Sequence, residues 1–299
     1  MDNTINMEKT AGLLSSISYR KAKNNIFKIA VMLFSFLTIS MVFLIIGTLL
    51  VKGYKQINWA FFTEVAPDTF TAMMATASGE VIPGGIANGI FGSIYLVLIA
   101  SVIAIPIGIV IGVYLSENSK KKYASVIRDI ADILQGVPSI VIGIIAYIWV
   151  VVPLTKGYSV LAGGVALAIM MLPLIVRSTE ESLKMVPETL KEAALALGTP
   201  YYKVIWRVLI PTAFSGLISG ILLAVSRVLG ETAPLMLTTL GNPDINWNIV
   251  KPGSAVPLLI WQFYNDPNMV NLIWSSTIFL MGFVLILNLI SKWIGAKRK

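Results

Sequence analysis

Long apolar segments alternate with polar ones along the chain, and six of the apolar segments are close to the length that crosses a membrane. An α-helix rises about 1.5 Å per residue, so about 20 mostly apolar residues span a hydrocarbon core roughly 30 Å thick. The predicted spans are Ile26–Val51, Asn88–Leu115, Val137–Leu154, Val160–Val176, Val208–Leu229 and Leu272–Ile294. The pattern predicts an all-α, polytopic membrane protein with six transmembrane helices, and it excludes an outer-membrane β-barrel.

These spans divide the chain into four parts. Residues 1–25 are predicted to form a flexible polar arm, and residues 26–87 hold the first span and an outer loop. Residues 88–294 form the helical core, and residues 295–299 form a short basic tail.

Most of the 23 Lys and Arg residues lie before the first span, between spans two and three, between spans four and five, and after span six. The opposite side has only Lys52, Lys55, Lys156 and Lys251. Cytoplasmic loops carry an excess of basic residues. Both termini are therefore predicted to be cytoplasmic, and the net charge of +8 requires no nucleic acid as a partner.

Composition supports a membrane protein and limits its chemistry. Hydrophobic residues make up 56% of the chain, charged residues 13%, and the mean hydropathy is +0.81. The chain has neither cysteine nor histidine. It therefore has no disulfides, no thiolate or imidazole metal ligands and no histidine base, and we expect neither a metal site nor catalytic residues.

Two outer segments, residues 53–87 and 241–271, are rich in aromatic residues. The set is Trp59, Phe61, Phe62, Phe70, Trp247, Trp261, Phe263 and Tyr264. Such residues are common at the membrane–water interface, where they form an aromatic belt. The alternative is a docking surface for an external protein.

The segment between spans four and five has the signals of a short amphipathic helix. Pro187 suits its first position and Gly198 its C-terminal cap. The apolar stripe, predicted to pack inward, is Val186, Leu190, Ala193, Ala194 and Leu197, and the polar face is Lys184, Glu188, Lys191 and Glu192. A helix resting on lipid normally has a basic polar face and bulky aromatics. This alanine-rich, glutamate-bearing helix favours docking to a protein.

The chain contains no P-loop motif, so energy for any transport comes from elsewhere. The stretch "EAALALGTPYYKVIWRVLIP" (Glu192–Pro211) resembles the EAA loop of binding-protein-dependent ABC importer permeases, with Thr199-Pro200 as a small departure. "GVPSIVIG" (Gly136–Gly143), "LPLIVRSTEESLKMVP" (Leu172–Pro187) and "RVLGETAPLML" (Arg227–Leu237) resemble, in order, motifs of the PstA-type phosphate permeases.

This resemblance implies a type I ABC importer permease fold in the plasma (inner) membrane, with the permease core over residues 88–294 and a coupling helix at about residues 180–198. The implied partners are a PstC-like sibling permease, a cytoplasmic ATPase dimer that binds ATP and Mg²⁺, and an extracytoplasmic phosphate-binding protein. The family's coupling residues fall on Glu192 and Gly198, and we add Glu188, Ala193 and Ala194 as the rest of the coupling surface.

The fifth span ends with an arginine and a glutamate four residues apart. Gly216, Gly220, Ala224, Arg227 and Glu231 are predicted to share one protein-facing stripe. The two charges either pair with each other or line a water-filled path for a tetrahedral oxyanion. Gly230 and Pro234 predict a broken helix here, as occurs beside transport paths.

Thr232 lies between the charges and this proline and is assigned to the same path. Arg177, at the end of span four, either anchors the cytoplasmic edge or lines the inner mouth of the path. Permeases for sulfate, molybdate or tungstate remain an alternative to phosphate. An intramembrane enzyme lacks its nucleophile and base, and a signalling scaffold would not need the EAA helix.

Overall fold

The computed structural model describes the backbone of residues 2–296 and the side chains of residues 20, 21 and 23–295. The chain forms two compact units, residues 1–51 and residues 52–299. Unit one is a helix, and unit two is a bundle of helices. Among the described residues the only β-type pairing is an isolated bridge between Leu240 and Gly253.

Unit one belongs to α1 (Asp2–Gly53), which begins far upstream of the predicted first span. Residues 2–25, predicted as a flexible arm, are instead helical and continuous with the span. From Ile26 onward, apolar side chains all around the helix are exposed, including Phe36 at 74% and Phe43 at 71%. A helix that is apolar on every side is typical of one surrounded by lipid.

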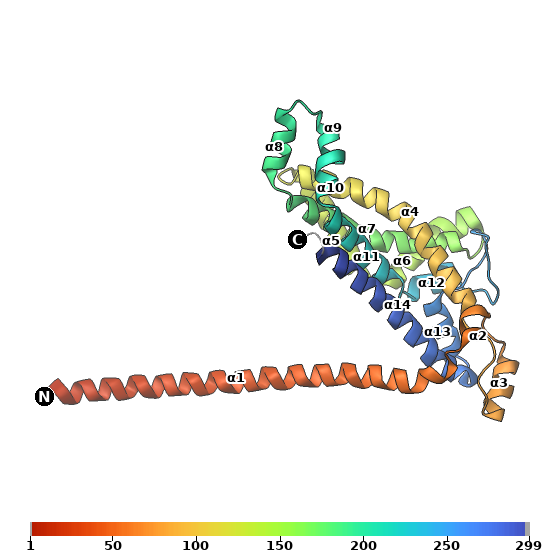
Figure 1. Ribbon diagram of the computed structural model, residues 1–299, viewed down its shortest axis with the longest axis horizontal. Helices are drawn as coiled ribbons and strands as arrows, with labels where there is room; N and C mark the ends of the chain where they lie inside the picture. The colour runs from red at the N-terminus through yellow and green to blue at the C-terminus, as the bar shows by residue number, and fades with distance from the viewer. Residues whose placement is uncertain (1, 297–299) are drawn as a thin grey trace. The chain divides into compact units, whose positions relative to one another are not determined.

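Unit two contains the remaining elements, of which Figure 1 labels the α-helices. Its α-helices are α2 (Trp59–Thr63), α3 (Thr69–Ser78), α4 (Ala87–Glu117), α5 (Lys122–Gly136), α6 (Ser139–Ala146), α7 (Val160–Lys184), α8 (Glu188–Ala196), α9 (Tyr201–Val204), α10 (Ile210–Thr212), α11 (Phe214–Val228), α12 (Ala233–Thr238), α13 (Val256–Tyr264) and α14 (Val270–Ala296). Two π-helices, η2 (Tyr147–Thr155) and η3 (Ile205–Leu209), and two 3₁₀ helices, η1 (Tyr54–Gln56) and η4 (Pro267–Met269), complete it.

Four described helices are long and apolar enough to cross a membrane, and two bent helix pairs raise the number to six if each pair is one span. The third predicted span, Val137–Leu154, corresponds to residues 139–155, and α5, which was not predicted, precedes it and meets it at 104°. The fifth predicted span is interrupted, with a 71° bend between α10 and α11. Proline is the shared cause, because Pro138 and Pro211 each remove a backbone donor near the bend.

Helix α4 packs closely along α7 because small residues occupy the contact. A Cβ atom on Gly108 would lie 2.6 Å from the Ile175 side chain, and one on Gly112 would lie 2.5 Å from Thr179. Such small-residue contacts let membrane helices approach closely. The largest buried cluster lies around these helices and includes Leu96, Leu167, Met171 and Ile175.

We expect Gly112→Ala to lower the free energy of unfolding by about 1–3 kcal/mol, because the new methyl group must push α7 away. Thermal unfolding of the purified chain in detergent would measure this loss. Gly282→Ala, on α14 with no atom within 4 Å of the added Cβ, is the matched control and should cause no loss. Equal stability of both variants would contradict the close packing.

The outer segments join the bundle instead of lying apart from it. Phe61 and Phe263 are buried in one cluster with Ile82, Ile86 and Leu272. The exposed aromatic residues are Trp59, Phe62, Phe70, Trp247, Trp261 and Tyr264. Two of the eight predicted interface aromatics are thus core residues, while the others are available to lipid or to an external partner.

One asparagine connects the outer loops to the start of α4. The Asn88 side-chain amide donates to the Asn242 carbonyl at 2.9 Å and to the Pro243 carbonyl at 3.0 Å. Its oxygen accepts from the Ala66 amide at 3.4 Å. Near the start of η4, the backbone amide of Asn268 donates to Asp266 and thereby lowers the pKa of that carboxyl. These hydrogen bonds order the end of the bundle at which α4 begins.

Candidate functional site

Helices α8 and α9 project as a hairpin beyond one end of the bundle, and α2 and α3 lie at the opposite end (Figure 1). Helix α7 continues to Lys184, so the segment 180–198, predicted as one coupling helix, is divided between the end of α7, a short loop and α8. Pro187 is the N-cap residue of α8 and not its first helical residue.

Gly198 ends the hairpin's first helix in the predicted way. Its φ of +76° is left-handed, a conformation that glycine adopts without steric cost. The Gly198 amide donates to the Leu195 carbonyl at 2.9 Å, and the Thr199 amide to the Ala194 carbonyl at 3.2 Å. These two bonds form a Schellman motif, which turns the chain sharply into α9.

The predicted assignment of residues to the inner and outer faces of α8 is wrong in part. No residue of α8 is buried, and Leu190 and Leu197 are exposed at 42% and 86%. Only Val186 and Ala194 pack against the neighbouring apolar cluster, whereas Lys191 turns inward. The reason is that the hairpin lies clear of the bundle, so the apolar stripe has little to pack against. The exposed residues of α8 are Glu188, Thr189, Leu190, Glu192, Ala193, Leu195 and Ala196.

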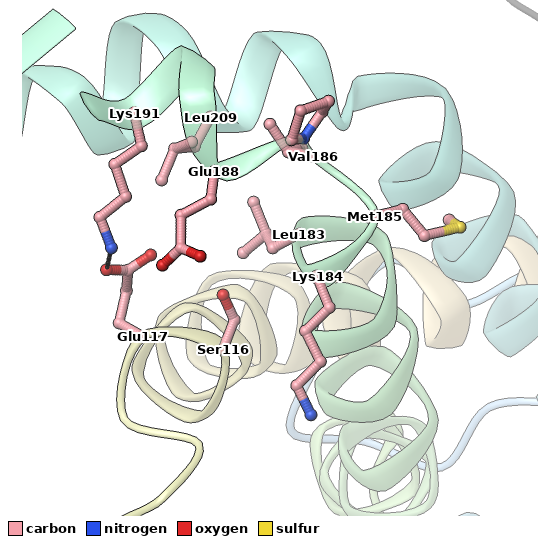
Figure 2. Close-up of a pocket in the computed structure, with 10 residues that line it drawn as sticks. Ser116, Glu117, Leu183, Lys184, Met185, Val186, Glu188, Lys191 and Leu209 are labelled. Carbon is pink, nitrogen blue, oxygen red and sulfur yellow. Dashed lines mark hydrogen bonds and ion pairs between the residues drawn. The ribbon is translucent and has the colours of Figure 1, made fainter. Parts of the chain in front are cut away.

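A single carboxylate at the end of α4 holds both helices of the hairpin. Glu117 Oε2 accepts hydrogen bonds from Lys191 Nζ on α8 and from Tyr201 Oη on α9. The Lys191 ammonium also lies 5.3 Å from the centre of the Tyr201 ring. Figure 2 shows Lys191 and Glu117 meeting beside a groove of about 420 Å³, with Glu188 and Ser116 on its lining.

A second charged cluster surrounds Glu180 on α7, whose side chain is 1% exposed. Arg128 Nε of α5 donates to it at 2.7 Å, Lys184 Nζ at 2.6 Å, and Arg177 Nη1 at 3.5 Å. Arg177 also donates through Nε to Asp132 of α5 at 3.0 Å and through Nη2 to the other oxygen. These ion pairs fasten α5 to α7.

We expect Glu180→Gln to lower the free energy of unfolding by about 2–4 kcal/mol, because the buried charge that joins Arg128 of α5 to α7 is lost. Thermal unfolding in detergent would measure the loss. Glu181→Gln is the control, since Glu181 is the next residue, is exposed and forms no side-chain bond among the described residues. A loss no larger than the control's would show that the cluster contributes little to stability.

The helix break predicted after Arg227 is present. Helix α11 ends at Val228 and α12 starts at Ala233, with Thr232 as the N-cap residue and no side-chain cap bond. Arg227 is exposed, and Glu231 and Thr232 are partly buried. Among the described residues no ion pair joins Arg227 and Glu231, because Glu231 has left the helix that would have placed it one turn above the arginine.

The small residues of α11 pack on α7 as predicted, but the charges do not share that contact. A Cβ on Gly216 would lie 2.4 Å from Ser182 Oγ, and one on Gly220 2.1 Å from Ser178 Oγ. Ala224 is 1% exposed. Arg227 instead lies on a face of α11 that the other helices of unit two leave uncovered, so within this unit it does not face protein.

The sequence reading missed Glu117, Arg128, Asp132 and Glu180. Their side-chain partners are 45 to 84 residues away in the chain, except for the local pairs of Glu180 with Arg177 and Lys184. Only the i,i+4 spacing of Glu180 and Lys184 was a usable signal. Among the residues whose side chains are described (20, 21 and 23–295), no group of three His, Cys, Asp or Glu side chains is arranged to hold a metal ion.

The sequence matches a known protein family and several of its members. Residues 104–299 match the family described as "Binding-protein-dependent transport system inner membrane component". The Yersinia pestis phosphate transport system permease protein PstA is 38% identical over 306 aligned positions, which cover 99% of each chain. PstA of Haemophilus influenzae is 36% identical, with 85% of this chain and 87% of the relative covered.

A solved structure shares the fold at low identity. An inward-facing structure of the MetNI methionine ABC transporter superimposes with a TM-score of 0.59 and 19% identity, covering 71% of this chain and 94% of that one. A second MetNI crystal form gives a TM-score of 0.55. At this identity the likeness concerns the arrangement of helices alone.

Proposed function

Because this chain belongs to the binding-protein-dependent transport system inner membrane components, and among them to the PstA phosphate permeases, we propose how its geometry serves phosphate import. The chain is the membrane permease subunit of a phosphate ABC importer. The observation that carries this function is the end-to-end match to PstA proteins, which includes the EAA hairpin and the broken helix.

The proposed topology has six spans and cytoplasmic termini in the plasma (inner) membrane. It counts α5–η2 and α9–α11 each as one bent span, in addition to α1, α4, α7 and α14. The distribution of basic residues supports this direction, and so does the separation of α8–α9 from α2–α3 at opposite ends of the bundle (Figure 1).

The α8 helix is proposed to couple the permease to the ATPase dimer, which binds ATP and Mg²⁺. Its support is the projecting, unburied surface of α8, with Leu190, Ala193 and Leu197 exposed beside Glu188 and Glu192. Apolar side chains surrounded by polar ones on a projecting element are typical of a protein contact. Gly198 fixes where this surface ends.

The translocation path is proposed to include Arg227, Glu231 and Thr232. Arg227 provides a planar set of N–H donors suited to a tetrahedral oxyanion, and the uncovered face of α11 leaves them available. Glu231, nearby on the chain but unpaired with Arg227, would weaken anion binding and so permit release. Arg177 is held by Asp132 and Glu180, which favours the anchoring role over lining the inner mouth.

The remaining proposed partners are a PstC-like sibling permease as heterodimer partner, an extracytoplasmic phosphate-binding protein and membrane lipid. The sibling would cover the face of α11 that carries Arg227, so that the path lies between two subunits. Exposed Trp59, Trp247 and Tyr264 at the outer end are available to the binding protein. Permeases for sulfate, molybdate or tungstate are not favoured, since the relatives across the whole chain are phosphate permeases.

Uptake of labelled phosphate, sulfate and molybdate at low concentration tests the function, in cells with and without this chain. We expect selective loss of phosphate uptake without it, and recovery when the gene is returned. If sulfate or molybdate uptake is lost instead, the importer fold still holds but phosphate is not the substrate.

A further inference from the structure

Helix α4 ends in a carboxylate that is nearly removed from water. The Glu117 side chain is 11% exposed, and its Oε2 accepts from both Lys191 and Tyr201. These donors come from α8 and α9, 74 and 84 residues further along the chain. Partly buried ion pairs are screened less by water and salt than exposed ones. One side chain of α4 therefore contacts both halves of the coupling hairpin.

Helix α8 has few other attachments to the bundle, whereas α9 is continuous with η3 and buries Val204. Helix α8 buries no residue, and its apolar contact is limited to Val186 and Ala194 on the cluster around Leu183 and Val204. The loop from Met185 to Pro187 is its covalent link to α7. With so little apolar surface buried, the position of α8 depends strongly on the polar contact at Glu117.

The charges near Glu117 make Lys191 its specific partner. Lys184 also lines the groove, but its ammonium is bound to Glu180. Glu188 lies on the same lining and has no ion pair among the described residues, so it adds negative charge that favours retaining Lys191 nearby (Figure 2).

Helix α4 extends from this contact to the outer end of the bundle. Its 31 residues correspond to about 46 Å of helix. Near its other end, Asn88 holds the outer loop at Asn242 and Pro243. Pro106 and the glycines facing α7 lie between the two ends, and the helix is continuous throughout. The coupling hairpin and the outer loop thus contact opposite ends of one element.

We propose that Glu117 is a positioning residue that fastens the coupling helix to α4, so that movement of α8 on the ATPase is transferred to α4 and along it toward the outer loops. This inference rests on the proposed coupling role of α8. It assigns a role to a residue outside the EAA motif. Glu117 touches neither phosphate nor ATP, and its effect is on how much transport each hydrolysed ATP yields.

The first test measures the attachment without any substrate. The chain has no native cysteine, so Lys120→Cys and Leu197→Cys provide two spin-label sites, one after α4 and one after α8. In the full chain in lipid nanodiscs, Glu117→Lys should broaden the distance distribution between them. The charge exchange Glu117→Lys with Lys191→Glu should narrow it again. An unchanged distribution in Glu117→Lys would overturn the attachment, whatever the substrate.

The second test measures coupling in proteoliposomes holding the complete importer. Glu117→Lys should lower phosphate transported per ATP hydrolysed about tenfold, the ratio given by a coupling change of 1.4 kcal/mol, with the ATPase still bound. The charge exchange should restore most of it, and Glu181→Lys, the exposed control, should change nothing. A normal ratio in Glu117→Lys overturns the proposal, whereas a wild-type importer that moves no phosphate overturns the proposed function instead.

Discussion

Arg227→Gln is expected to reduce phosphate uptake to background while the importer still assembles. The guanidinium is exposed on α11 beside a helix break, and glutamine removes its charge and its fork of donors. If charge-assisted hydrogen bonds to the anion contribute about 3 kcal/mol, the loss is roughly 100-fold. Uptake of labelled phosphate and co-purification of the subunits would measure the two properties separately.

Two further variants define what Arg227 contributes. Arg227→Lys keeps the charge but not the fork, so it should retain an intermediate rate. Arg207→Gln, in the π-helix η3 before the bend, removes another exposed arginine and should leave uptake unchanged. Full transport by Arg227→Gln would show that Arg227 does not bind the anion in the path. The arginine would then serve only to anchor α11 at the outer membrane interface.

The helical class and the approximate positions of the spans were predictable because hydropathy is a local property. In lipid, a run of about 20 apolar residues forms a helix, because a helix pairs its backbone N–H and C=O groups within the segment. The breaks were only partly predictable. Gly230 and Pro234 indicated the interruption after Arg227, but α5 was missed because it is amphipathic and contains no long apolar run.

The polar contacts of the site were not predictable for a different reason. Lys191 was assigned to the exposed face of the coupling helix from its periodicity, which assumes that polar residues face water. The structure turns it inward because Glu117, distant in the sequence, offers a charge there. A single sequence shows which residues can form ion pairs, but the packing of the helices determines which of them come into contact. The same holds for Glu180, whose burial requires cations from two helices.

Leu197→Asp is expected to abolish transport by releasing the ATPase from an intact chain. Leu197 is 86% exposed, so the chain itself loses no buried surface when this side chain changes. Burying a leucine at an interface contributes about 1.5–3 kcal/mol, and burying an unpaired carboxylate costs more. ATPase association should therefore weaken at least about 100-fold, as measured by co-purification, with the thermal stability of the isolated chain unchanged.

The control for Leu197→Asp separates a protein contact from a lipid contact. Tyr264→Asp changes a similarly exposed residue, 76% accessible, at the end of α13, a helix that lies away from α8 (Figure 1), and the ATPase should remain bound. If α8 instead rested on lipid, Leu197→Asp would leave ATPase association intact. Leu197→Asp thus distinguishes the two interpretations of α8, docking to the ATPase and resting on lipid. Only in the first does ATPase association depend on this leucine.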